Sequence, residues 1–145
     1  MKASSARAKT ITRASAKGDP LPAGVAAARV RAGLPIADFD DVRALLGLTV
    51  EDLAARIGIS IATLSRRRRG RQALDAAHGD RLLRFARLFR LAAALHDGDE
   101  EAARAWLVKP ARALDGATPL DHAGTEIGAR EVEDLIGRLE HGVYT

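Results

Sequence analysis

The sequence predicts an all-α protein. Apolar residues make up 47% of its 145 residues, but alanine and leucine dominate them, and aromatic residues account for only 3%. β-Strands are enriched in β-branched and aromatic residues, so this composition favours helices. Apolar residues also recur at helical spacing between capping residues and glycines, and these signals indicate where each helix begins and ends.

Two helices are expected in the first third of the chain. One spans about Val25 to Ala32 and ends at Gly33, and the next runs from about Ile36 to Leu46, with Gly47 as its C-cap. Residues 1–23 lack the apolar stretch of a secretory signal and are rich in Ala, Ser, Lys and Arg. They are expected to form a flexible basic tail, which either adds phosphate contacts or is simply disordered.

Residues 48–70 have the pattern of a helix-turn-helix. Thr49 is a good N-cap for a short helix with acidic residues in its first turn, and Gly58 ends that helix. Ser60 caps the next helix, Ile61 to Arg69. Only residues 58–60 separate the two helices, and so short a link holds them at the steep angle of this motif.

The second helix of this motif is expected to read DNA. Leu64 is its apolar anchor and Gly70 ends it, while Arg67 is expected to pack its stem on the core and hold its guanidinium at the surface. Four consecutive arginines fan around a helix at about 100° per residue, so Arg68 points aside towards phosphate. A merely solvated run of charge is the alternative. The residues expected to contact DNA are Ser60, Ile61, Ala62, Thr63, Ser65, Arg66, Arg68, Arg69 and Arg71.

A long helix is expected from Asp75, its N-cap, to about Leu95. At 1.5 Å per residue it is roughly 30 Å long, which is long for a small bundle. It either bridges two domains or forms part of a dimer interface. A basic stripe of arginines recurs every three residues along the side opposite its apolar face: Arg81, Arg84, Arg87 and Arg90.

The C-terminal part begins after a polar hinge at residues 96–99, which divides the chain into a basic tail (1–23), a DNA-binding domain (24–95) and a second domain (96–145). Asp99 caps a helix to about Val108, Thr118 and Pro119 start a short helix, and Thr125 caps the last helix, to about His141. The apolar and aromatic residues 143–145 either insert into a partner's pocket or fold back on their own domain.

Charge is distributed unevenly along the chain, whose net charge is +4. Residues 60–90 carry nine Lys or Arg against two Asp or Glu, whereas residues 91–145 carry five against eleven. The basic middle suits the phosphates of double-stranded DNA. The acidic C-terminal part would be repelled by DNA and should face a different partner.

Many kinds of functional site are missing from the sequence. It has no cysteine, which excludes disulfides and thiolate metal sites and favours a reducing cytoplasm. No run of 18 apolar residues predicts a membrane span. Glycine-rich phosphate loops, HExxH and GxSxG are absent, and the four histidines are scattered. We therefore expect no enzyme activity, no cofactor, no metal and no membrane.

Residues 97–145 contain many features in a distinctive order and spacing. They are Trp106-Leu107, Pro110, Ala113-Leu114, Gly116, Pro119-Leu120, Thr125, Gly128, Val132, Leu135, Ile136, Leu139 and His141-Gly142. This series resembles the toxin-binding domain of the Xre/MbcA/ParS antitoxin family, and residues from about 33 to 90 resemble that family's helix-turn-helix. The expected fold is therefore an N-terminal Xre-type helix-turn-helix bundle followed by a small helical toxin-binding domain.

The resemblance implies a function for both parts. Such proteins pair with a toxin that carries a RES domain and destroys cellular NAD. The antitoxin's C-terminal domain covers the toxin's active-site cleft, and its helix-turn-helix represses the shared promoter. By similarity, the toxin-blocking face would comprise Arg130, Glu133, Arg138, His141, Tyr144 and Thr145. Ile61 and Ala62 depart from the usual polar residues of the recognition helix, but they suit thymine methyl groups.

The expected partners are a RES-domain toxin, double-stranded operator DNA and a second copy of the chain. A homodimer is expected because a two-fold pair of recognition helices is the usual way to read a two-fold operator. The alternative is a stand-alone helix-turn-helix regulator whose C-terminal domain only mediates protein assembly. A toxin gene beside this one would separate the two functions.

Overall fold

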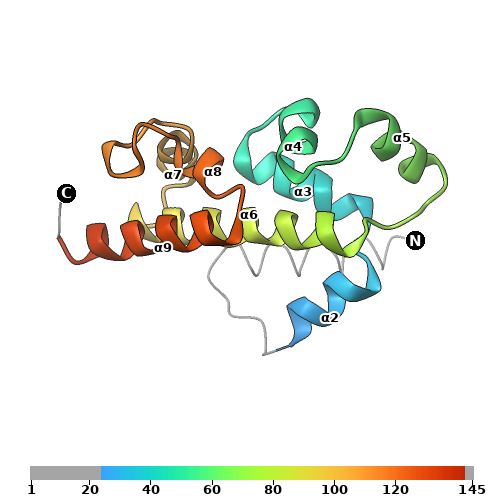
Figure 1. The fold of residues 1–145 in the computed structure, drawn as a ribbon, viewed down its shortest axis with the longest axis horizontal. Coiled ribbons are helices and arrows are strands. Elements are labelled where there is room, and N and C mark those ends of the chain that lie inside the picture. The colour runs from blue at the N-terminus through green and yellow to red at the C-terminus, as the bar shows by residue number, and fades with distance from the viewer. Residues whose placement is uncertain (1–23, 143–145) are drawn as a thin grey trace.

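The computed structural model describes residues 24–142, and within them it confirms an all-α protein (Figure 1). The only β-type contact in this part of the chain is an isolated bridge between Leu34 and Leu74. The helices, in chain order, are α2 (Val25–Ala32), α3 (Ile36–Leu46), α4 (Val50–Ile57), α5 (Ile61–Arg69), α6 (Ala76–Leu95), α7 (Glu100–Leu107), the 3-10 helix η1 (Arg112–Leu114), α8 (Pro119–His122) and α9 (Glu126–Glu140). The predicted basic tail lies outside the described residues.

The long helix α6 runs through the centre of the fold (Figure 1). It contacts α2, α3 and α4 of the first part of the chain and α7 and α9 of the second part. A single cluster of buried apolar residues joins the two parts, from Phe39 on α3 through Phe89 on α6 to Val132 on α9. The long helix therefore bridges both parts, while the division at residue 96 stays a prediction.

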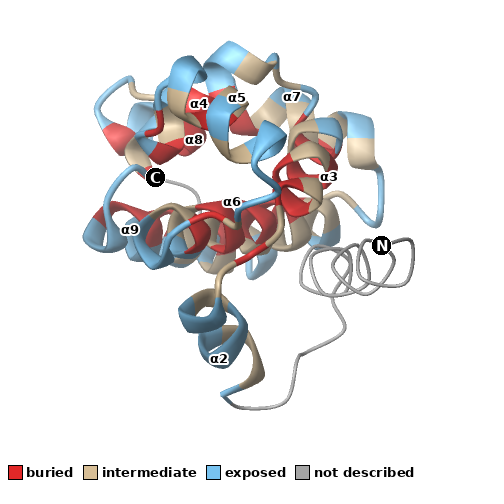
Figure 2. Ribbon diagram, turned by 90° about the vertical axis from the view of Figure 1, so that its right-hand side faces the viewer, coloured by how far each residue is buried: buried red, intermediate tan, exposed pale blue. Residues whose placement is uncertain are grey.

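Buried residues gather where α3, α6 and α9 face the rest of the fold, whereas α2 has none (Figure 2). Within the described part of the chain, the eight-residue helix α2 makes its main helix contact with α6. No helix of residues 24–142 is both long enough and apolar enough to cross a membrane.

The predicted N-caps are confirmed. Each of these side chains accepts a hydrogen bond from the backbone N–H three residues later, which satisfies one of the free donors at a helix start. The six capping residues are Thr49, Ser60, Asp75, Asp99, Thr118 and Thr125. Because these signals are local, the sequence places most helix boundaries to within one residue.

Helix α5 ends at Gly70, as predicted, but Gly70 is not the residue in the left-handed conformation. Gly70 has φ −82°, and the left-handed residue is Arg71, with φ +52°. The N–H of Gln72 donates to the carbonyl of Arg67 at 2.8 Å, and the N–H of Arg71 donates to the carbonyl of Arg68 at 3.3 Å. These are the two hydrogen bonds of a Schellman motif, which here places an arginine where glycine is usual. The short helix η1 was also not predicted.

Candidate functional site

The recognition helix α5 lies at the surface at one end of the molecule (Figure 1). Leu64 is buried and anchors it, while Ile61, Ala62, Arg66 and Arg69 are exposed. Of the other predicted DNA contacts, Ser60, Arg68 and Arg71 are exposed, and Thr63 and Ser65 are half-buried. The hydroxyl of Ser60 donates to that of Thr63 at 2.8 Å, so these two side chains are already engaged with each other.

Arg68 makes a contact that the sequence did not reveal. Its two terminal nitrogens donate to the two carboxylate oxygens of Asp40 on α3, at 2.9 and 3.0 Å. This bidentate hydrogen bonding raises the pKa of the Arg68 guanidinium above its ordinary value. The arginine expected to point towards phosphate is therefore held by an acid of its own chain in the absence of DNA.

Arg67 is half-buried, as its place after Leu64 predicts. Its guanidinium does not simply reach solvent, because Nη1 donates to the carbonyl of Ala73 at 2.8 Å. This hydrogen bond ties the end of α5 to the loop that leads into α6. Arg67 therefore has a structural partner, and the other arginines of α5 form its exposed basic surface.

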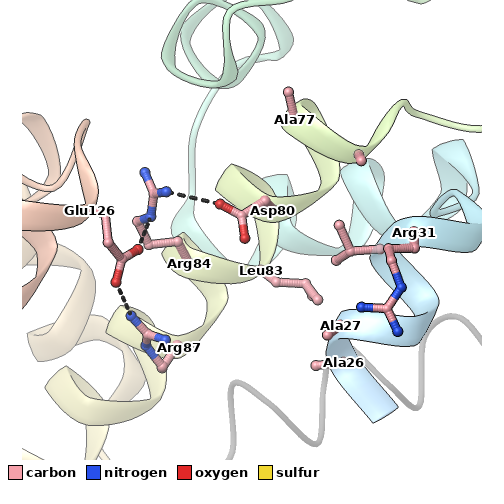
Figure 3. A pocket seen from close by; sticks show the side chains of 11 residues that line it. Ala26, Ala27, Arg31, Ala77, Asp80, Leu83, Arg84, Arg87 and Glu126 are labelled. Carbon is pink, nitrogen blue, oxygen red and sulfur yellow. Dashed lines mark hydrogen bonds and ion pairs between the residues drawn. The ribbon is translucent and has the colours of Figure 1, made fainter. Parts of the chain in front are cut away.

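The four arginines of the α6 stripe are half-buried, and three of them contact other groups of the protein; Figure 3 shows two of these, Arg84 and Arg87. Arg81 donates to the carbonyl of Ile57 at 2.9 Å. Arg84 pairs with Asp80 of its own helix at 2.9 Å and with Glu126 of α9 at 3.2 Å. These side chains hold helices together, so the exposed positive charge in this region lies on α5 and Arg71.

Glu133 was expected on the toxin-blocking face, but its carboxylate lies 2.7 Å from the Arg87 guanidinium of α6. The remaining described residues of that set, Arg130, Arg138 and His141, are exposed on α9 or at its end. Tyr144 and Thr145 lie outside the described residues. The structure thus separates Glu133, which faces α6, from three side chains that are exposed to solvent.

Two further arginines join the two parts of the chain. Arg56 at the end of α4 makes an ion pair with Asp121 of α8, and this contact lowers the pKa of the Asp121 carboxyl below its usual range. Arg104 of α7 donates through Nε to the carbonyl of Leu45 at 2.7 Å. Sequence reasoning missed both contacts, because no local pattern links an arginine to a partner in a different helix.

A carboxyl group is buried in the first part of the chain. Asp38 of α3 is 0% exposed, and neither of its side-chain oxygens has a hydrogen-bond partner. Burial raises its pKa from 3.8 to about 7, with nearby Asp41 adding to the rise and Arg29 opposing it. Asp38 belongs to no candidate metal site, since residues 24–142 contain no group of three or more potential metal ligands.

A cavity of about 600 Å³ lies between α2, the first half of α6 and the start of α9 (Figure 3). Its charged lining is nearly balanced, with Arg31, Arg84 and Arg87 against Asp80 and Glu126. Most of its other lining residues are alanines, and none is a histidine, serine, threonine or tyrosine. This lining offers no nucleophile and no general base other than carboxylates that are already paired with arginine.

Comparison with known proteins matches both parts of the chain. A sequence model of the antitoxin Xre-like helix-turn-helix domain matches residues 25–87, and one of the antitoxin Xre/MbcA/ParS C-terminal toxin-binding domain matches residues 91–142. The protein named Antitoxin Xre of Photorhabdus laumondii is 35% identical over 113 residues, which cover 78% of this chain and 76% of that protein. The chain belongs to the Xre antitoxin family.

Further Xre antitoxins extend this result. The Antitoxin Xre of Yersinia enterocolitica is 32% identical over 116 residues, covering 80% of this chain and 78% of that protein. The one of Pseudomonas putida is 32% identical over 84 residues, covering 58% of this chain and 52% of that protein. Members of this family are antitoxins and not enzymes. The chain therefore combines a helix-turn-helix domain with a toxin-binding domain.

Proposed function

We propose that this Xre-family antitoxin blocks a RES-domain toxin that degrades NAD, and that it represses its own operon through α5. The observation that carries the proposal is the placement of two free surfaces at opposite ends of α6 (Figure 1). One is the exposed basic helix α5, and the other is the outer side of α9, in the matched toxin-binding domain. Each surface is available without displacing the core.

The toxin-blocking face in this proposal comprises Arg130, Arg138 and His141, continued by Tyr144 and Thr145. The first three side chains are exposed and lie along the last helix or just beyond it, so one partner surface can meet them together. Glu133 acts from behind this face: its ion pair with Arg87 holds α9 against α6. Acidic side chains on the outer side of α9, such as Asp134 and Glu140, suit a basic cleft.

The DNA-binding face in this proposal is the exposed side of α5 with Arg71. Arg66 and Arg69 are the strongest candidates for direct contact, because no ion pair within residues 24–142 engages either of them. Arg68 would exchange Asp40 for a phosphate. A homodimer would present two copies of α5 to a two-fold operator. Both the toxin and the operator would be met in the cytoplasm.

Co-expression with the product of the adjacent gene tests the toxin-blocking half of this proposal. Cells that express the adjacent product alone should lose NAD and stop growing, and cells that also express the antitoxin should keep both. A pull-down should recover the two proteins as one complex. If growth stops without loss of NAD, the chain would still act as an antitoxin, but its toxin would not be an NAD-degrading RES-domain protein. No complex and no effect on growth would leave a helix-turn-helix regulator.

A further inference from the structure

A shallow groove lies on the C-terminal part, between the chain that follows α7 and the second half of α9. Its volume is about 230 Å³, below the roughly 300–1,000 Å³ of most small-molecule sites, so it suits one or two side chains. Trp106 and Leu139 are only half-buried beside it, and neighbouring Val108 is 47% exposed. The main lining residues are Trp106, Lys109, Pro110, Arg112, Leu135 and Leu139.

The end of α9 lies beside this groove, because Leu139 of its last turn is one of the lining residues. Gly142 has φ +73°, and its N–H donates to the carbonyl of Leu139 at 3.2 Å. This is one of the two hydrogen bonds of a Schellman motif, which is frequently accompanied by a contact between the next residue and the last turn of the same helix. That next residue is Val143, and Leu139 of the last turn lines the groove.

We propose that residues 143–145 occupy this groove in the free protein, with the Tyr144 ring against Trp106 and Leu139. Three residues span up to about 10 Å, and Leu139 is only about 4.5 Å from Gly142 along the helix, so the reach is sufficient. Two aromatic rings attract each other in offset or edge-to-face contact. The guanidinium of Arg112 beside the groove adds a cation for the Tyr144 ring.

The chain's own segment is favoured over other occupants because its attachment at Gly142 gives it a high effective concentration at the groove. A second copy of the chain or a partner protein would have to bind without that advantage. This proposal concerns the free chain and does not depend on the toxin. If residues 143–145 also insert into a toxin, the groove and the toxin compete for the same three residues.

The sequence supplies a direct optical test, because Trp106 is its single tryptophan and Tyr144 its single tyrosine. Deleting residues 143–145 from the full chain should shift Trp106 emission to longer wavelength and increase its quenching by acrylamide, a neutral probe. Tyr144→Phe keeps the ring and should leave both close to wild type. Unchanged Trp106 emission and quenching in the deleted chain, with helical circular dichroism intact, would overturn the proposal.

Cross-linking identifies the occupant, because the chain has no native cysteine. Mild oxidation of a variant with Ala113→Cys and Thr145→Cys, which keeps the Tyr144 ring, should form a disulfide within one chain, since Ala113 lines the groove and disulfides need Cα atoms about 5.5 Å apart. The matched control combines Thr145→Cys with Ala77→Cys, an exposed site in the first turn of α6, and should not cross-link. Disulfides that link two chains would assign the groove to a second copy and overturn the proposal, as would the absence of a disulfide.

Discussion

The Arg87 guanidinium of α6 lies 2.7 Å from a carboxylate oxygen of Glu133 on α9. Glu126 extends this contact, since it lies 3.2 Å from Arg84 of the same central helix (Figure 3). The basic stripe of α6 and part of the acidic surplus of the last third of the chain therefore meet each other. Some of the charges expected to face two separate partners therefore hold the toxin-binding part against the central helix.

Replacing Arg87 with alanine should weaken the attachment of α9. The side chains of Arg87 and Glu133 are 40% and 30% exposed, so solvent screens the pair and the expected loss is about 1 kcal/mol of unfolding free energy. Urea denaturation followed by circular dichroism measures it. Arg130→Ala is the matched control, because Arg130 is 75% exposed and 3.6 Å from Glu126. Equal losses in the two variants would show that the Arg87 pair has no special role.

Replacing Asp40 with asparagine should release Arg68 for DNA. Asp40 holds both terminal nitrogens of this arginine, and its negative charge also repels phosphate. We expect tighter binding to duplex DNA and a salt dependence that is steeper by about one phosphate contact. Fluorescence anisotropy at several salt concentrations measures both.

Asp80→Asn is the control for this experiment, because it removes the same charge from α6 at a site paired with Arg84. It should change DNA binding little. Weaker binding by the Asp40→Asn variant would mean that Asp40 orients Arg68 for DNA rather than withholding it.

Two glycines of α9 should respond in opposite ways to alanine. A Cβ atom at Gly128 would collide with the carbonyl oxygen of His122, whereas one at Gly137 would meet nothing within 4 Å. Gly128→Ala should therefore lower the unfolding free energy by about 3 kcal/mol or more, because backbone atoms must shift. Gly137→Ala should raise the unfolding free energy by up to about 1 kcal/mol, because alanine has a higher helix propensity than glycine. Thermal unfolding compares them, and a stabilised Gly128→Ala variant would contradict the close packing of α8 on α9.

The buried carboxyl of Asp38 should make stability depend on pH. Its pKa is about 7 in the folded chain and near 3.8 when exposed, so the folded state binds more protons between these values. The contribution of Asp38 to stability therefore falls as pH rises from about 4 to 7. Asp38→Asn should raise the unfolding free energy more at pH 8 than at pH 5, by about 2–3 kcal/mol. An equal change at both pH values would contradict a buried neutral acid.

The helix boundaries followed from the sequence because their signals are local. Thr49, Ser60 and Thr125 each cap a helix through a hydrogen bond to a residue three positions away, so composition and order suffice to find them. The left-handed conformation of Arg71 was not predicted, because a non-glycine residue in this conformation leaves no clear signal in the sequence.

The pairing of charges could not be predicted, because it depends on which helices meet. The sequence shows Arg68 and Glu133 as surface charges, and only the fold brings Asp40 and Arg87 beside them. Family resemblance placed Glu133 on the toxin-blocking face together with Arg138 and His141. The structure gives Glu133 a partner on α6 and leaves the other two exposed.

The central claim is that one chain blocks a toxin and reads DNA through separate surfaces. The most direct measurement is the NAD content of cells that express the adjacent gene product together with the Arg66→Ala, Arg69→Ala variant. These two arginines lie on α5, away from α9 (Figure 1). NAD should stay at the level seen with the wild-type antitoxin, although binding of the variant to operator DNA is lost. A collapse of NAD with this variant, at equal protein level, would contradict the separation.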